Sequence, residues 1–133
     1  MKQLTDMDKP ENKLAGRIIE AAITVHRELG PGLLESVYHT CLCRELTVMG
    51  LNVQREVSVP VIYKGEQTGQ LLRLDLMVEN LLVVEIKSSF ELLPVFKLQL
   101  NTYLKISQKR LGLLINFNVP LLKDGIVRIA NGL

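Results

Sequence analysis

The hydrophobic periodicity of this chain changes at Gly50, and this change constrains the fold more than any other feature. Residues 12–29 and 34–49 place apolar side chains at three- and four-residue steps, which is typical of amphipathic helices. From residue 53 to 59, mostly apolar side chains alternate with polar ones, which predicts a strand. One face carries Val53, Arg55, Val57 and Val59, and the other carries Gln54, Glu56 and Ser58. The chain therefore begins with two helices and continues into a sheet.

The rest of the chain predicts four further strands and one helix. The run at 81–87 is almost continuously apolar, which is typical of a central strand covered on both faces. The expected elements are strands at 71–78, 81–87, 111–117 and 126–129 and a helix at 94–107. The order ααβββαββ predicts an α/β chain of α+β-like character, with helices flanking a mixed sheet. Within strand 71–78 we expect Leu74 and Leu76 on one face and Arg73 and Asp75 on the other.

Composition limits the class of protein. A chain of 133 residues, 47% of them hydrophobic, suits one domain with its own core and excludes intrinsic disorder. We expect this domain at residues 12–133, behind a short tail at residues 1–11. The net charge of +2 excludes a strongly basic nucleic-acid-binding protein. The chain begins without an apolar leader, its apolar runs fall far short of a membrane span, and Cys41 and Cys43 suit free thiols. These features predict a cytoplasmic protein without a membrane segment.

Two acids and a lysine interrupt the apolar strands around the predicted hairpin turn. Depending on the loop length, Asp75 falls opposite Val84 or Glu85. Glu85 and Lys87 are two residues apart and share one strand face, so the three charged side chains can converge on one patch. Mg²⁺ prefers oxygen ligands and binds through one or two carboxylates, and such a metal could activate water for attack on a phosphate. A solvated strand face with a Glu–Lys pair would explain the same residues without a site.

This arrangement resembles the D…ExK core of the PD-(D/E)XK nuclease superfamily. Asp75 is followed by Glu85-Ile86-Lys87 at the end of an apolar strand, and Leu74 stands in place of the proline. The segment from Gly32 to Tyr38, GLLESVY, matches the motif that names the GxxExxY protein family within that superfamily. The resemblance continues through HRELGPG at 26–32, RLDL at 73–76, QLNTYLK at 99–105 and GLLINF at 112–117. It covers nearly the whole chain after the first dozen residues.

The resemblance implies a restriction-endonuclease-like fold and assigns roles by position. The implied metal-binding acids are Glu35, Asp75 and Glu85, the implied catalytic lysine is Lys87, and a QxxxY element adds Gln99 and Tyr103 to the catalytic set. The implied cofactor is Mg²⁺, for which Mn²⁺ could substitute. Simpler explanations exist for three of these residues. Glu35 favours the macrodipole of its helix, Gln99 suits the polar flank of an amphipathic helix, and Tyr103 suits a core aromatic residue with a wet hydroxyl.

The resemblance further implies a Mg²⁺-dependent nuclease that hydrolyses phosphodiester bonds through metal-activated water, with DNA favoured over RNA. Candidate contacts to nucleic-acid phosphates are Arg73, Lys97, Lys105 and Lys109, although such residues also suit a solvated face. The alternative is a non-catalytic module of the same fold that binds nucleic acid or a protein partner. A chain of this length leaves little room for a second, substrate-wrapping domain. A homodimer or a partner protein could therefore complete the binding groove.

Overall fold

The computed structural model describes residues 9–133, which form a five-stranded mixed sheet flanked by helices. The elements in chain order are α1 (Pro10–Leu29), α2 (Glu35–Val48), β1 (Val53–Tyr63), β2 (Glu66–Val78), β3 (Leu82–Lys87), α3 (Pro94–Ser107), β4 (Leu111–Asn116), the 3₁₀ turn η2 (Leu122–Gly125) and β5 (Ile126–Ala130). This confirms the predicted order and class, to which the structure adds η2. Of the tail expected at residues 1–11, residues 1–8 lie outside the described part, and residues 10 and 11 belong to α1.

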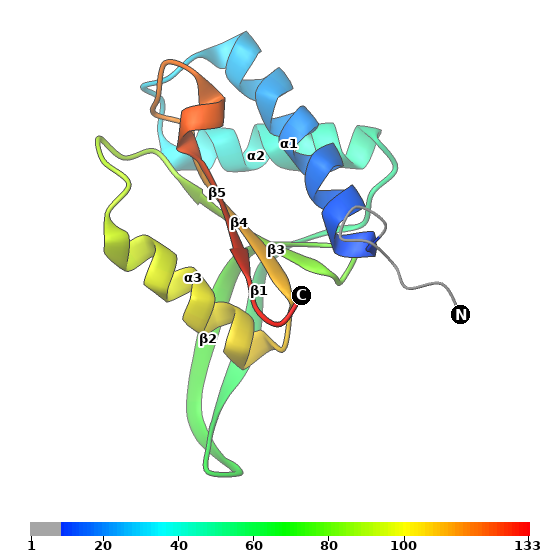
Figure 1. Cartoon of the computed structure of the whole chain (residues 1–133), viewed down its shortest axis with the longest axis vertical. Helices are drawn as coiled ribbons and strands as arrows, with labels where there is room; N and C mark the ends of the chain where they lie inside the picture. Colours follow the sequence, from blue (N-terminus) through cyan, green and yellow to red (C-terminus); the bar gives the residue numbers. More distant parts are fainter. Residues whose placement is uncertain (1–8) are drawn as a thin grey trace.

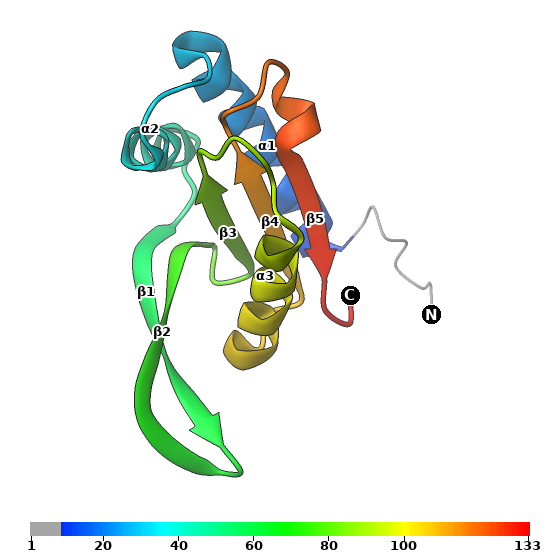
Figure 2. The same ribbon diagram turned by 90° about the vertical axis from the view of Figure 1, so that its left-hand side faces the viewer.

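The strands lie side by side in the order β1-β2-β3-β4-β5. β3 and β4 are parallel, and the other neighbours are antiparallel. A parallel pair needs a crossover connection, and α3, which follows β3 and precedes β4 in the chain, supplies it by running back along the sheet (Figure 1). The carboxyl ends of β3 and β4 therefore lie at the same end of the sheet, where the loops before α2 and α3 also meet (Figure 2).

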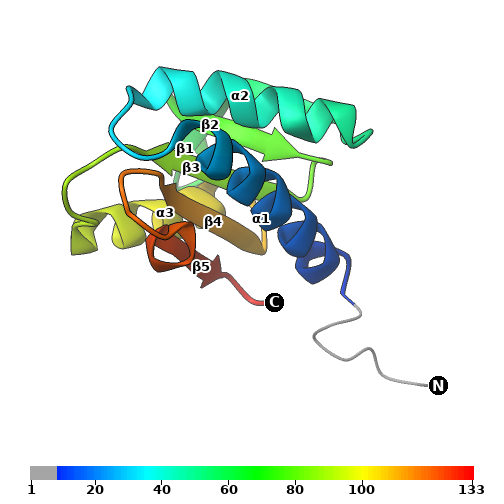
Figure 3. The same ribbon diagram turned by 90° about the horizontal axis from the view of Figure 1, so that it is seen from above.

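The sheet has a covered face on each side, which makes a three-layer arrangement. α1 and α2 pack against each other and cover one face (Figure 3), while α3 covers the other. In β3 the side chains of Leu82, Val84 and Ile86 enter the α1–α2 core, and Val83 enters the α3 core. The prediction of a central strand covered on both faces is confirmed. No helix among the described residues has both the length and the hydrophobicity to cross a membrane. Cys41 and Cys43 are free thiols.

The β1–β2 hairpin is long and projects beyond the rest of the sheet (Figures 1 and 2). The expectation of one continuous apolar face along β2 is wrong, because Leu74 packs in the α3 core whereas Leu76 packs in the α1–α2 core. The reversal occurs where Glu56 of β1 adopts a left-handed backbone with φ of 50°. A left-handed residue interrupts strand alternation, and a two-stranded ribbon twists strongly once no third strand restrains it. Asp75 lies at this level of the ribbon.

Candidate metal and active site

Asp75 and Glu85 face each other where β2 and β3 separate. The last paired residues of the two strands are Leu76 and Val84, and continuing this register by one residue places Asp75 opposite Glu85. Of the two alternatives left open by the sequence, the structure therefore has the longer loop. Beyond that point the carboxylates complete the strand pairing: Ile86 N donates to Asp75 Oδ2 at 2.8 Å, and Asp75 N donates to Glu85 Oε1 at 3.2 Å.

The carboxyl group of Glu85 has an unusual environment for an acid. The residue is only 5% exposed. Burial, and after it the charge of Asp75, raises the pKa of Glu85 from 4.5 to about 9. Without a cation, Glu85 is therefore protonated at neutral pH and shares a hydrogen bond with the Asp75 side chain. A bound divalent cation would reverse this preference, since it favours the charged form of both carboxyl groups.

Lys87 lies two residues after Glu85 and is the last residue of β3. Its Nζ atom is 4.6 Å from the ring centroid of Phe96 on α3, which is a cation–π distance. Its charge also acts on Glu85 and Glu35. The lysine thus has an aromatic support on one side and the acids on the other.

Glu35 begins α2 and lines the same pocket as Asp75. Partial burial raises its pKa, the charge of Lys87 opposes this rise, and the charge of Asp75 adds to it. The Ser88 backbone also lowers the pKa of Glu35 through a hydrogen bond. These interactions bring Glu35 into the electrostatic environment of the site. Among residues 9–133, however, no three His, Cys, Asp or Glu side chains form a ready metal-binding cluster. The structure therefore pairs two acids, and Glu35 as a third ligand stays a prediction.

The loop before α2 is held by three hydrogen bonds to the hydroxyl groups of two side chains. Buried Tyr38 donates its hydroxyl proton to Gly30 O at 2.6 Å and accepts from Leu33 N at 3.1 Å. Ser88, directly after β3, donates its hydroxyl to Leu33 O at 2.6 Å. The loop is thus tied both to its own helix and to the strand that carries Lys87. This gives a physical role to the tyrosine of the GxxExxY pattern, which positions the start of α2.

The structure brings the two α3 residues, Gln99 and Tyr103, to the same region. The pKa of Tyr103 is raised first by burial and then by the charges of Glu85 and Asp75, while a hydrogen bond from Gln99 lowers it. Tyr103 also packs against the α3 core, so its ring and its hydroxyl have separate surroundings.

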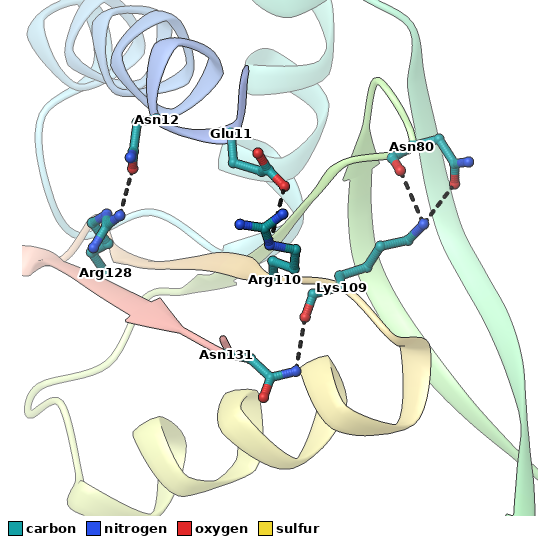
Figure 4. A network of polar contacts seen from close by, with 7 residues as sticks. All are labelled: Glu11, Asn12, Asn80, Lys109, Arg110, Arg128 and Asn131. Carbon is teal, nitrogen blue, oxygen red and sulfur yellow. Dashed lines mark hydrogen bonds and ion pairs between the residues drawn. The ribbon is translucent and has the colours of Figure 1, made fainter. Parts of the chain in front are cut away.

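The four basic candidates divide between the two ends of the sheet. Lys97, in the first turn of α3, and Arg73, two residues from Asp75, are exposed and belong to the end of the sheet that carries the acids. Lys109 lies at the other end of β3, where its Nζ donates to Asn80 O at 3.0 Å and to Asn80 Oδ1 at 3.2 Å (Figure 4). Lys105, in the last turn of α3, is also at that end. The structure does not bring Lys105 and Lys109 to the acids.

Sequence reasoning missed two residues beside the acids, His39 and Arg55. Arg55 NH2 donates to His39 Nδ1 at 3.1 Å, and His39 Nε2 contacts Asp75 O at 3.2 Å. A signal was present, because Arg55 interrupts an otherwise apolar strand face. Both residues line a pocket that also contains Glu35 and Asp75.

Comparison with known proteins shows the superfamily of this chain. No curated protein matches the chain. The crystal structure of SSO0001 is similar, with 25% sequence identity and a TM-score of 0.49 over 71% of this chain. The chain spans 47% of the length of SSO0001. The sequence model of the PD-(D/E)XK nuclease superfamily matches residues 12–129, and the chain belongs to that superfamily.

Proposed function

We propose that this chain is a Mg²⁺-dependent nuclease that hydrolyses phosphodiester bonds of nucleic acid, DNA in preference to RNA. The observation that carries the proposal is the Asp75–Glu85 pair where β2 and β3 separate, with Lys87 two residues after Glu85 on the same strand. Two buried or half-buried acids that share a proton are costly in an apolar sheet without a ligand. A divalent cation is the ligand that would compensate this cost.

The donor set fits magnesium. Mg²⁺ binds through one or two protein carboxylates and keeps several waters, so Asp75 and Glu85 suffice as direct ligands. Glu35 is the proposed third acid, and Mn²⁺ is the proposed substitute ion. When bound, the ion would supply water activation and charge neutralisation at the phosphate.

The chain's own residues have distinct tasks in this proposal. Glu85 must release its proton when the cation binds, because its raised pKa keeps it protonated beforehand. Lys87, supported by Phe96, stabilises charge that develops on the phosphate. Gln99 holds the Tyr103 hydroxyl near both acids, where the phenol can donate to the substrate. Arg73 and Lys97 are exposed and can contact flanking phosphates.

The reaction can be tested with single- and double-stranded DNA and RNA in Mg²⁺ and in Mn²⁺. We expect cleavage by the wild type, loss of cleavage in Asp75→Asn and Lys87→Ala, and unchanged cleavage in Lys13→Ala, a matched exposed lysine on α1. Calorimetric titration with Mn²⁺ should show binding that Asp75→Asn removes. Cleavage that survives both site substitutions would refute the assignment.

A non-catalytic module of the same fold would give another result. It would bind nucleic acid or a protein partner with no cleavage in any cation, and Mn²⁺ binding would be absent or unaffected by Asp75→Asn. We further propose that the protein acts in the cytoplasm and that a second copy or a partner protein contributes to the nucleic-acid groove. Sedimentation with and without DNA tests this last point.

A further inference from the structure

A pocket lies on the α2 side of the acid pair, between α2, β1 and β2. Its volume is about 220 Å³. Since water takes about 30 Å³ in the liquid, the pocket has room for a phosphate group with its nearest waters. Its lining includes three acids, Glu35, Glu56 and Asp75. It also includes three residues that can donate hydrogen bonds to an anion: Arg55 and the hydroxyl residues Ser36 and Thr40. The pocket therefore brings acids and hydrogen-bond donors together.

The exposed guanidinium of Arg55 is hydrogen-bonded to α2 beside the acid pair. It donates to His39 Nδ1 at 3.1 Å and reaches Thr40 Oγ1 at 3.4 Å. Because a guanidinium only donates and a carbonyl only accepts, His39 accepts from Arg55 at Nδ1 and donates from Nε2 to Asp75 O. The charge of Arg55 is thus tied through one imidazole ring to the backbone of Asp75.

Among the described residues, no carboxylate lies within salt-bridge distance of this charge. No salt bridge within residues 9–133 involves Arg55, although Glu56 is its neighbour in sequence and acids line the same pocket. The guanidinium uses one nitrogen for its contacts with His39 and Thr40, which leaves other N–H donors for a ligand. The first turn of α2, with Ser36 as its second residue, presents its positive dipole end to the same region.

We propose that Arg55, together with the hydroxyls of Ser36 and Thr40, binds a phosphodiester phosphate of the nucleic-acid substrate beside the Asp75–Glu85 pair. The proposal rests on the proposed nuclease function and assigns the pocket as its phosphate subsite. Guanidinium groups bind phosphate oxygens through paired hydrogen bonds, which gives a fixed orientation as well as affinity. The acids that line the pocket match the cation that accompanies the phosphate. One pocket thus holds both halves of a metal–phosphodiester complex.

The test compares two arginine substitutions that change the net charge equally. Arg55→Gln removes the proposed phosphate contact. Arg128→Gln is the matched control, since Arg128 is an exposed strand arginine on β5, at the opposite edge of the sheet, where it donates to Asn12 (Figure 4). Both are made in a Lys87→Ala background so that the probe stays intact. The probes are short fluorescein-labelled single-stranded and duplex DNA in Mg²⁺, and the readout is fluorescence anisotropy over a series of NaCl concentrations.

We expect Arg55→Gln to raise Kd roughly tenfold, as loss of a charged hydrogen bond predicts. It should also reduce the slope of log Kd against log salt by about 0.7 for single strands and 0.9 for duplex, the share of one phosphate contact. Arg55→Lys should keep the slope, because it keeps the charge. Arg128→Gln should leave affinity within about twofold, as expected for a residue that contacts no phosphate.

The outcomes separate this inference from the proposed function. If Arg55→Gln and Arg128→Gln have the same Kd and salt slope, Arg55 only supports His39 and the inference is wrong, even if the wild type cleaves DNA. A weaker affinity that follows lower folding stability, with an unchanged salt slope, also refutes it. A third outcome is that binding depends on Arg55 but the wild-type protein, with Lys87 intact, cleaves no substrate in any cation. The phosphate subsite then stands and the nuclease proposal fails.

Discussion

Replacing the carboxyl group of Glu85 with an amide should stabilise the metal-free protein at alkaline pH. In the folded chain, burial and then Asp75 raise the pKa of Glu85 to about 9, whereas in the unfolded chain the pKa returns to about 4.5. Between these values the folded state retains a proton that the unfolded state has lost. The stabilisation is complete below about pH 4.5 and is lost as the pH rises toward the folded pKa of Glu85.

The size of the effect follows from the width of this window. Each pH unit within it lowers the free energy of unfolding by at most about 1.4 kcal/mol, so the range from about pH 5 to pH 8 accounts for roughly 4 kcal/mol at most. This is a large share of the roughly 5–15 kcal/mol that stabilises a typical domain. Glutamine preserves the local contacts, because its oxygen can accept from Asp75 N and its amide can donate to the Asp75 carboxylate.

Urea unfolding in EDTA at several pH values, followed by far-ultraviolet circular dichroism, measures this difference. The wild type and Glu85→Gln should have similar stability near pH 5, and the variant should be more stable by several kcal/mol at about pH 8. Glu20→Gln, at an exposed position of α1, is the matched control and should follow the wild type. If Glu85→Gln loses stability in parallel with the wild type, Glu85 is not protonated in the folded chain and the reasoning is refuted.

Three further predictions concern other contacts. Phe96→Leu removes the ring beneath Lys87 and should lower kcat roughly three- to thirtyfold with little change in KM, while Phe96→Trp restores the rate; equal rates in steady-state assays of both variants and wild type would exclude the cation–π support. Tyr38→Phe should lower the free energy of unfolding by about 1–3 kcal/mol, because Leu33 N and Gly30 O lose a buried partner while the stacking on Phe117 persists. A loss below about 0.5 kcal/mol in urea unfolding would contradict the role of the hydroxyl. Gly125→Ala should destabilise the fold by about 2 kcal/mol or more, since the new Cβ would lie 2.2 Å from Asn116 O. Gly16→Ala, with open space around it in α1, should instead stabilise the fold by about 0.5–1 kcal/mol. Thermal melts in which both variants behave alike would disprove the steric argument.

The secondary structure could be predicted from sequence because periodicity and breakers act locally. The helix at Pro94–Ser107 has the predicted bounds, and the apolar run ending at Lys87 is the predicted central strand. The spacing of Glu85 and Lys87 on one strand likewise required no tertiary information. The resemblance supplied Gln99 and Tyr103, and the structure places both near the acids.

The remaining features depend on tertiary contacts that sequence patterns do not contain. The change of faces in β2 follows from the left-handed backbone of Glu56, a residue type for which this conformation is uncommon. Arg55 shares its strand face with Val53, which packs against the α1–α2 core, but its contacts with His39 and Thr40 of α2 are long-range and could not be predicted from alternation. Lys109 belonged to a basic segment in the sequence, yet the β2–β3 turn engages its ammonium at the far end of the strand.

The projecting β1–β2 hairpin has a mechanical consequence for the acids. β2 carries Asp75 and β3 carries Glu85, and the two strands share only three paired positions, from Leu76 to Val78. The separation of the two carboxyl groups therefore depends on the angle at which the hairpin leaves the sheet and on the two hydrogen bonds that link Asp75 and Glu85 to the opposite strand. A ligand that holds the hairpin at one angle selects one separation, and by reciprocity a cation that selects a separation stiffens the hairpin. Contacts made by the projecting hairpin are therefore coupled to the geometry of the acid pair.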